Sequence, residues 1–340
     1  PFNGTCFSVN PSPTNYQFVF KAANSNELIG ERLMTKEGVQ SPFILKSFIA
    51  GGAFGQVYRG LNERTGQLVA IKLEHNDAPH RQLYLEFGFY LKLGKNCPYI
   101  PAIYFFGIVG EVWNALVMDL LGPSLKKLYE TLGQFSEQCT AAVGVSLMRI
   151  FSDFHKKGLL FRDVKPDNFL VGRPNSKNAH SIYLIDMGLA KEWRDENGRH
   201  ISFAIDKPIT GTPQFMSTNM HQNQELSRRD DIESLIYVLI YLQTGTLPWF
   251  VVDEEVGKNM RKRVEKYGEL KGNLSAEEIC VNMPPAYGKI LKKIRKLKFV
   301  EAPDYKDYIR KLGSVLAESS INLNRLEKAF DWNRSHTRRS

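Results

Sequence analysis

The sequence predicts an α+β protein of two lobes, a small strand-rich lobe followed by a larger and mainly helical one. Residues 43–120 contain short apolar runs typical of strands and one helical stretch, whereas residues 121–333 carry apolar side chains at helical spacing. At 340 residues, the chain is longer than one typical domain, and its apolar fraction of 43% is ordinary for a protein with a real core. We therefore expect two lobes around a cleft.

The ends of the chain differ from this pattern. Residues 1–42 contain Asn, Ser, Thr and Pro without sustained periodicity, apart from a short apolar patch at residues 18–20. This composition predicts a partly disordered N-terminal arm that docks locally. We assign residues 334–340 to a C-terminal tail.

The first lobe contains a glycine-rich turn between two predicted strands, over residues 49–57. Glycine lets the backbone approach phosphate oxygens closely, although a glycine cluster between strands is also common in ordinary hairpins. A lysine at the end of the next apolar strand, Val69-Ala70-Ile71-Lys72, favours a nucleotide site. The residues of this predicted site are Ala50, Gly52, Gly55, Val57, Ala70 and Lys72.

A lysine in an apolar strand needs a partner, and Glu86 is the candidate. Residues 81–93 read as a helix, on which Leu83, Phe87 and Tyr90 form an apolar stripe beside Glu86. The alternative is that Glu86 is a solvated helix carboxylate.

Four polar residues in the second half have the spacing that phosphoryl transfer requires. Asp163, Lys165 and Asn168 stand at relative positions 0, +2 and +5, and a predicted buried strand at residues 182–185 leads into Asp186. Asp163 is expected to accept the hydrogen bond of a substrate hydroxyl, and Lys165 to offset phosphate charge. Asn168 and Asp186 supply the oxygen ligands that Mg²⁺ prefers. Each fragment alone is common in loops and turns, but the combination predicts a catalytic site.

Helices are predicted for most of the remaining chain. Ser136 is a candidate N-cap of a helix that ends near Lys156, and the nearly all-apolar residues 232–242 predict a buried helix. Residues 289–298 place apolar side chains on one face and cations elsewhere. We interpret this cationic face as solvated, with membrane-surface or substrate docking as alternatives.

Composition limits the partners. The net charge of +9 favours acidic partners, and no nucleic-acid motif is present, so nucleic acid is not expected. The four cysteines are scattered without metal-ligand spacing, which is typical of reduced thiols in the cytoplasm or nucleus. No apolar run reaches the roughly 20 residues of a membrane span, and the start does not resemble a signal peptide. We expect a monomeric cytoplasmic protein, with a nuclear or peripheral membrane location as alternatives.

Further motifs follow those above in the order found in protein kinases. They are Leu121-Gly122-Pro123-Ser124-Leu125, Lys165-Pro166-Asp167-Asn168-Phe169-Leu170, Leu189-Ala190-Lys191, Thr210-Gly211-Thr212, Ser227-Arg228-Arg229-Asp230-Asp231 and Phe330-Asp331-Trp332-Asn333. On these motifs, residues 43–333 resemble the casein kinase I family of the protein kinase superfamily, and residues 171–174 together with the predicted helix of Glu86 resemble its gamma branch most. The usual Ala-Pro-Glu element is missing, as in that family, and Ser217-Thr218-Asn219 stands where the family has Ser-Ile-Asn.

The resemblance implies a bilobal protein kinase fold and transfer of the γ-phosphate of ATP, with Mg²⁺, to Ser or Thr hydroxyls of proteins. It assigns adenine pairing to the carbonyl of Asp119 and the amide of Leu121, so the Asp119 side chain itself need not matter for this pairing. Met118 and Leu170 complete the nucleotide site. Asp231 is expected to hold the backbone of the catalytic loop, against the alternative of a simple helix cap.

The same resemblance implies which residues recognise the substrate. Casein kinase I enzymes favour acidic or already phosphorylated substrates, and read that charge with a lysine and an arginine flanking the Thr-Gly-Thr motif. Lys207 matches the lysine, but Gln214 stands at the arginine position. We therefore expect weakened dependence on a priming phosphate.

Some positions depart from the usual kinase pattern. Ala50 replaces the first glycine of the nucleotide loop, Phe161 replaces the common His, and Met187 replaces Phe after Asp186. Of these changes, Ala50 and Met187 leave open a nucleotide-binding pseudokinase that acts as a scaffold. A small-molecule phosphotransferase is a weaker alternative, because residues 195–212 resemble a protein-substrate activation segment.

Overall fold

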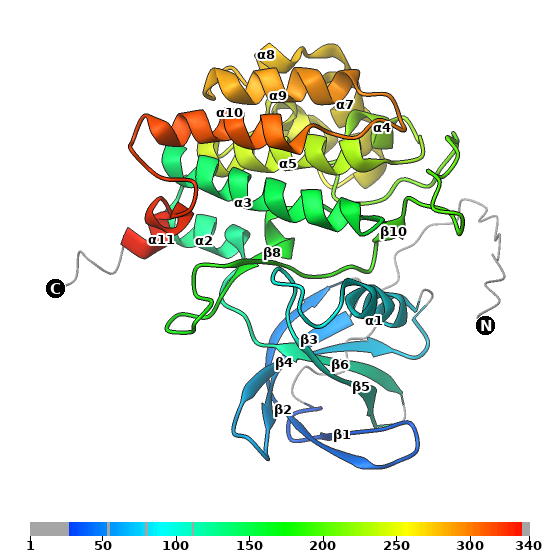
Figure 1. Ribbon diagram of the computed structural model, residues 1–340. Coiled ribbons are helices and arrows are strands. Elements are labelled where there is room, and N and C mark those ends of the chain that lie inside the picture. The colour runs from blue at the N-terminus through cyan, green and yellow to red at the C-terminus, as the bar shows by residue number, and fades with distance from the viewer. Residues whose placement is uncertain (1–26, 53–54, 79–80, 111, 335–340) are drawn as a thin grey trace.

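The structure is a computed structural model that describes residues 27–52, 55–78, 81–110 and 112–334. A strand-rich lobe lies against a larger helical lobe, and residues 120–124 connect them (Figure 1). The predicted fold class, an α+β protein of two lobes, is confirmed.

The small lobe is an antiparallel barrel with one helix beside it. Its strands are β1 (Arg32–Met34), β2 (Gln40–Gly52), β3 (Gly55–Asn62), β4 (Leu68–His75), β5 (Ile103–Val109) and β6 (Trp113–Asp119). They pair in the order β1-β2-β3-β4-β6-β5, and α1 (Gln82–Leu93) follows β4 in the chain. Alternate residues of a strand face the same side, so Val69, Ile71 and Leu73 of β4 all enter the barrel core.

The barrel begins earlier than the sequence suggested. β1 pairs with β2 and, through Met34 and Ile108, with β5. The start of the small lobe predicted at residue 43 is therefore too late, because a strand of three residues is too short to show periodicity and is ordered by its pairing. The remainder of the predicted arm, residues 1–26, and tail residues 335–340 lie outside the described residues.

The large lobe consists of helices around a central pair, with four short strands near the cleft. The strands are β7 (Leu159–Leu160), β8 (Phe169–Val171), β9 (Ile182–Leu184) and β10 (Lys191–Glu192). The helices are α2 (Leu125–Leu132), α3 (Glu137–Lys156), α4 (Thr218–His221), α5 (Arg228–Thr244), α6 (Asp253–Val256), α7 (Met260–Asn273), α8 (Ala276–Ile279), α9 (Pro285–Lys296), α10 (Tyr305–Ala317) and α11 (Asp331–Arg334), with 3₁₀ turns η1 (Pro166–Asn168), η2 (Pro248–Val252) and η3 (Leu326–Lys328).

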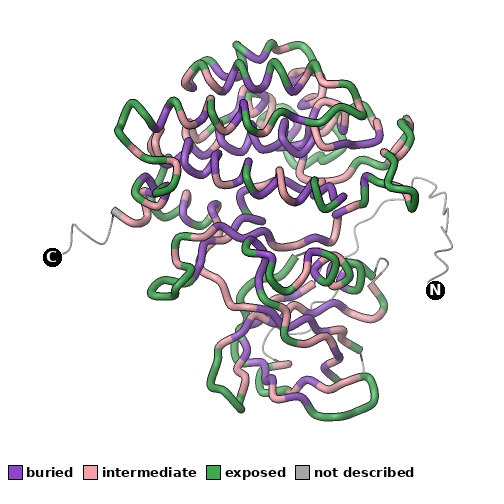
Figure 2. Tube along the Cα trace, in the orientation of Figure 1, coloured by how far each residue is buried: buried purple, intermediate pink, exposed green. Residues whose placement is uncertain are grey.

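The central helices form where the apolar pattern predicts them. Ser136 caps α3, because its hydroxyl accepts a hydrogen bond from the amide of Cys139 at 3.2 Å. Residues 232–240 of α5 are all buried, and Figure 2 shows the burial concentrated in the middle of this lobe. α3 and α5 pack together and support the loop that carries the predicted catalytic residues.

The cationic helix α9 is held by its apolar face. Ile290 and Ile294 are fully buried, whereas Lys292 and Lys293 remain exposed. These two lysines form ion pairs with Glu277 at 2.7 Å and Asp307 at 2.8 Å. The contacts are those of a solvated helix face.

The structure also shows the surroundings of three cysteines and the length of the apolar helices. Within the described residues, Cys97, Cys139 and Cys280 are all buried. Across the same part of the chain, no single helix has the length and apolar character to cross a membrane. One bent pair, α5 with Pro248–Val256, meets that test by length and composition only.

Candidate active site

The predicted catalytic residues meet in one loop of the large lobe, between β7 and β8. The Nζ of Lys165 lies 2.6 Å from Oδ2 of Asp163. The amide nitrogen of Asn168 donates to the carbonyl oxygen of Asp163 at 2.9 Å and to its Oδ2 at 3.2 Å. The Asp163 carboxylate is thus oriented from two sides, as catalysis by a positioned base requires.

A third contact to Asp163 was not predicted from the sequence. The hydroxyl of Thr212 donates to the other carboxylate oxygen, Oδ1, at 2.9 Å. The neighbouring Gly211 has φ +95°, and a Cβ there would lie 2.8 Å from the carbonyl oxygen of Arg162, so glycine allows the close approach. The Thr210-Gly211-Thr212 motif marked the segment, but it did not indicate which atom the segment contacts.

The lysine of the predicted nucleotide site connects the two lobes. The Nζ of Lys72, on β4, lies 2.7 Å from Glu86 of α1 and 2.8 Å from Asp186 of the large lobe. The predicted pairing with Glu86 is therefore confirmed, and Glu86 is only 1% exposed rather than solvated. Because Lys72 contacts residues of both lobes, it brings the small-lobe site and the predicted metal ligands together.

Charges in this cluster shift the pKa values of its members. Burial acts against the Lys72 ammonium, but Glu86 and Asp186 outweigh burial and raise the pKa of Lys72. Burial raises the pKa of Glu86, with Lys72 opposing the shift. Burial also acts to raise the pKa of Asp186, but Lys72 outweighs it, so this pKa is lowered. The lowered pKa keeps Asp186 ionised and able to bind a cation.

The residues assigned to Mg²⁺ fit that ion chemically. Asn168 uses its amide nitrogen for Asp163, so its amide oxygen is the atom that can bind a metal. Asp186 is 21% exposed at its side chain and contributes a second hard oxygen ligand. Asp186 also has φ +62°, an uncommon conformation for a residue with a side chain, which functional sites can contain.

The nucleotide loop residues lie on the β2–β3 hairpin. Ala50 pairs with Val57, and Gly52 pairs with Gly55, whereas residues 53 and 54 lie outside the described residues. Gly55 has φ +126°, and a Cβ at this position would lie 2.0 Å from the carbonyl oxygen of Leu73. Only glycine can therefore occupy position 55 in this hairpin.

The other predicted nucleotide residues surround Lys72. Val57 lies opposite Lys72 in the sheet, and Ala70 lies opposite Met118. Leu170, on β8, forms an isolated bridge with Ser124, which places it next to the connection between the lobes. The two lobes thus contribute neighbouring surfaces to one site.

The Asp119 side chain has a structural role that the sequence analysis did not expect. Its Oδ2 accepts a hydrogen bond from the amide of Ala102 at 2.9 Å, and its Oδ1 accepts one from the hydroxyl of Tyr104. The amide of Asp119 donates to the carbonyl of Ala102 at 3.0 Å. This role was not predicted from the sequence: the side chain fastens the connection between the lobes to the start of β5. These contacts involve neither the carbonyl of Asp119 nor the amide of Leu121, the two groups that are predicted to pair with adenine.

Asp231 supports the catalytic loop as predicted. Its carboxylate accepts hydrogen bonds from the amides of Phe161 at 2.7 Å and Arg162 at 2.8 Å. It also lies 2.8 Å from Nε2 of His155, and it is 2% exposed. The backbone of Arg162 has φ +65°, and the two amide contacts stabilise this conformation.

The residues predicted to read substrate charge have internal contacts. The Nζ of Lys207 lies 3.4 Å from Oε2 of Glu225, and the same oxygen accepts a hydrogen bond from Lys191 at 2.8 Å. Burial acts to raise the pKa of Glu225, but the two lysines lower it. The carbonyl of Gln214 accepts a hydrogen bond from the indole of Trp249 at 3.0 Å. Glu225 was missed, because nothing in its sequence spacing connects it with Lys207.

Carboxylates of α5 hold the segment where the Ala-Pro-Glu element is missing. Asp230 accepts hydrogen bonds from the side chains of Ser217 and Asn219, each at 2.8 Å. Glu233 accepts from the amide and the hydroxyl of Thr218, at 3.1 and 3.0 Å. The Ser217-Thr218-Asn219 segment is thereby fixed to the large-lobe core.

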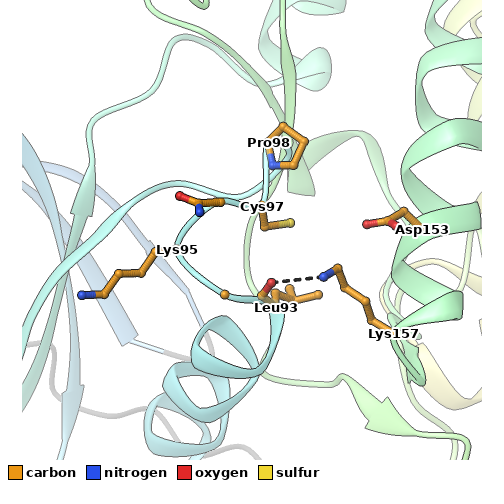
Figure 3. Close-up of a pocket in the computed structure, with 8 residues that line it drawn as sticks. Leu93, Lys95, Cys97, Pro98, Asp153 and Lys157 are labelled. Atoms are coloured by element: carbon orange, nitrogen blue, oxygen red, sulfur yellow. Dashed lines mark hydrogen bonds between the residues drawn. The ribbon is translucent and has the colours of Figure 1, made fainter.

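A cavity of about 400 Å³ lies outside this site, between the end of α1 and α3 (Figure 3). It is lined by residues 93–98 together with Asp153 and Lys157. The Nζ of Lys157 donates to the carbonyl of Leu93 at 3.3 Å. None of the predicted site residues line it, and the Lys157 contact beside it ties the end of α1 to the large lobe.

Comparison with known proteins shows which family this chain resembles. A family model described as a protein kinase domain matches residues 43–302. "Casein kinase I homolog 1" of Schizosaccharomyces pombe is 41% identical over 290 residues, which are 84% of this chain and 63% of that protein. "Casein kinase I homolog 2" of the same yeast is 38% identical over 286 residues, covering 84% and 64%. "Casein kinase I homolog 1" of Saccharomyces cerevisiae is 37% identical over 313 residues, covering 92% and 56%. The chain thus spans less than two thirds of the length of these relatives.

Proposed function

Because this chain belongs to the protein kinase family, and because its similarity to casein kinase I homologues supports that branch, we propose that it transfers the γ-phosphate of MgATP to serine and threonine hydroxyls of proteins. The observation that carries the proposal is the contact of Lys72 with Asp186 at 2.8 Å. It joins the nucleotide side of the cleft to the carboxylate next to the catalytic loop.

Each side chain of the site has a role in this reaction. Asp163 accepts the hydrogen bond of the substrate hydroxyl and orients it, and Lys165, 2.6 Å away, offsets phosphate charge. Lys72, held by Glu86, binds nucleotide phosphates. Mg²⁺, held by Asn168 and Asp186, supplies charge neutralisation on the phosphates when it is bound. Little covalent chemistry is required from the protein, so positioning and electrostatics account for the catalysis.

The substrates we propose are proteins with acidic or phosphorylated segments, recognised with weakened dependence on a priming phosphate. The net charge of +9 supports attraction to acidic segments, and the neutral Gln214 supports the weak priming. The closer assignment to the gamma branch stays a prediction that rests on residues 171–174 and on the helix that carries Glu86. A monomer is a further proposal, as is a cytoplasmic location with a nuclear or peripheral membrane location as alternatives; the free thiols of Cys97 and Cys280 support a reducing compartment.

The competing proposal is a nucleotide-binding scaffold without catalysis. Ala50 and Met187 are its support, since both depart from the common kinase pattern. Met187 is nevertheless fully buried in the large-lobe core, where a flexible apolar side chain can fill the space. The contacts of Lys72, Asp163 and Lys165 favour the enzyme over the scaffold.

A phosphate-transfer assay separates these proposals. Purified protein is incubated with labelled MgATP and casein or an acidic peptide, and phosphoamino-acid analysis follows. We expect phosphoserine or phosphothreonine in the product. The Asp163→Asn variant is purified in parallel, because activity from a contaminating kinase would persist in it. Nucleotide binding without phosphate incorporation by the wild type would instead support the scaffold.

A further inference from the structure

A lysine is completely buried beneath the segment that leads into α4. Lys271, near the end of α7, is 0% exposed. Its Nζ donates to the carbonyl oxygens of Pro213 at 2.8 Å and Met216 at 2.9 Å. It also lies 3.1 Å from Nε2 of His221. Lysine is rarely buried unless its donors are satisfied, so these partners form a specific site for the side-chain nitrogen of Lys271.

Aromatic rings complete the surroundings of this ammonium. The ring centroids of Trp249, Tyr237 and Tyr267 lie 4.5, 5.3 and 5.9 Å from the Nζ. Such rings attract a cation through their negatively polarised faces. Lys271 therefore bridges the aromatic core of the large lobe and the backbone of residues 213–216.

The bridged segment is connected to the catalytic carboxylate. The amides of Phe215 and Met216 donate to the carbonyl of Thr212, at 2.9 and 3.1 Å. The hydroxyl of Thr212 donates to Asp163 at 2.9 Å. Trp249 holds the same segment through the carbonyl of Gln214 at 3.0 Å. Contacts thus run without interruption from Lys271 through residues 212–216 to Asp163.

We propose that Lys271 is a positioning residue for substrate phosphorylation. By binding two carbonyls of residues 213–216, it fixes the surface that faces the substrate near Gln214 and keeps Thr212 against Asp163. The inference rests on the proposed kinase function, but the position of the loop can be measured without any activity.

Lys271→Met tests the role, because methionine fills a similar volume and removes every donor. The matched control is Lys266→Met on the same helix, where the lysine is 41% exposed and pairs with Glu269 at 3.3 Å. We expect Lys271→Met to raise the KM for a peptide substrate about tenfold and to lower kcat, with the KM for ATP unchanged. The control is expected to match the wild type.

The KM for peptide distinguishes positioning from loss of folded protein. A variant that is only partly folded has fewer active molecules, which lowers the apparent kcat but leaves KM unchanged. If Lys271→Met lowers the apparent kcat alone, the residue is merely structural and the proposal is wrong. If this variant does not fold, Trp249→Phe is used instead, because it removes the neighbouring donor to the carbonyl of Gln214. We expect Trp249→Phe to raise the KM for the peptide as well. A KM equal to that of the wild type would overturn the proposal.

Hydrogen exchange gives a readout that is independent of catalysis. In Lys271→Met, or in Trp249→Phe if that substitution is needed, we expect the amides of Phe215 and Met216 to exchange about tenfold faster than in the wild type, with no change in α3. Equal exchange rates would overturn the positioning role even if the enzyme is active. Faster exchange with an inactive wild type would support the positioning role and reject the proposed function.

Discussion

The ammonium of Lys207 lies 3.4 Å from the carboxylate of Glu225, so an internal acid already neutralises the cation that the sequence predicts for reading phosphate. Lys191 shares the same carboxylate oxygen at 2.8 Å. A substrate phosphate would have to compete with Glu225 for these lysines. In the proposed function, this competition and the neutral Gln214 would both reduce the binding free energy that a primed substrate can gain.

The first prediction concerns Gln214. Gln214→Arg is expected to increase the preference for a primed peptide about ten- to hundredfold, because a hydrogen bond to a charged group is worth about 1.5–3 kcal/mol and arginine adds a bidentate donor. The measurement is kcat/KM for two peptides that differ only in a phosphoserine three residues before the target serine. A wild type that already prefers the primed peptide about a hundredfold, with no gain in the variant, would show that another cation, such as Arg261 or Lys262, reads the phosphate.

The second prediction concerns the catalytic carboxylate. Asp163→Asn is expected to lower kcat about a hundredfold or more, because the amide cannot accept the substrate proton. MgATP should still raise its melting temperature as in the wild type, since the nucleotide contacts remain. Lys72→Met is the comparison, and it should lose that thermal shift. Turnover retained by Asp163→Asn would show that another group orients the hydroxyl.

The third prediction concerns the contact of Thr212 with Asp163. Thr212→Val removes the hydroxyl without changing the size of the side chain, and we expect kcat/KM to fall about tenfold or more. Thr212→Ser keeps the donor and should retain most of the activity. Equal losses in both variants would assign the effect to packing of the methyl group instead.

The fourth prediction is that the protein is active without phosphorylation of its activation segment. Residues 201–209 are already tied to the large lobe, because Ala204 accepts from Glu225 and Lys207 donates to Asn223, each at 2.8 Å. Arg162, which could receive a phosphate, donates its Nε to the carbonyl of Leu189 at 2.7 Å. Phosphatase-treated protein should keep its activity within about twofold. Activity that appears only after treatment with an upstream kinase would contradict this.

The fifth prediction concerns the pH dependence of stability. Burial raises the pKa of Asp230 to about 6, against the lowering effect of its hydrogen bonds from Ser227 and Asn219. The folded protein therefore binds this proton more tightly than the unfolded chain, and the resulting stability is full below the ordinary value of 3.8 and lost as the pH rises through about 6. From about pH 7 to about pH 5, the free energy of unfolding of the wild type minus that of Asp230→Asn should increase by about 1–2 kcal/mol.

Chemical denaturation of both proteins at several pH values checks this. Other titrating groups are common to the two proteins and cancel in the difference. A difference that stays constant, or that decreases on acidification, would mean that Asp230 remains ionised in the folded state.

Local features made most of the site predictable from the sequence. Asp163, Lys165 and Asn168 lie within one loop, so their spacing in the chain limits their spacing in the structure. Lys72 and Glu86 could be paired because a buried lysine requires an acid and α1 follows β4 directly. The apolar patterns of α3 and α5 predicted their burial for the same local reason.

Contacts between distant segments were not predictable in this way. Thr212 and Asp163 are 49 residues apart, and Lys271 and Pro213 are 58 apart. On α7, Lys271 follows several charged residues, a pattern that predicts a solvated helix face. The Asp119 side chain was missed because the family resemblance assigned a role to its backbone alone. In each case the partner is determined by tertiary packing, which the periodicity of one segment does not contain.

The contacts of Asp231 have a consequence for which substitutions the catalytic loop can tolerate. Asp231 binds the backbone amides of Phe161 and Arg162, which every amino acid except proline provides. The side chain at position 161 is therefore not needed to hold the loop. Phe161 packs within the aromatic core instead, and its ring centroid lies 6.0 Å from that of Phe154 and 6.3 Å from that of Phe169. Packing of the ring in this core therefore limits which side chains position 161 accepts, whereas the backbone contacts that hold the loop two residues before Asp163 do not depend on that side chain.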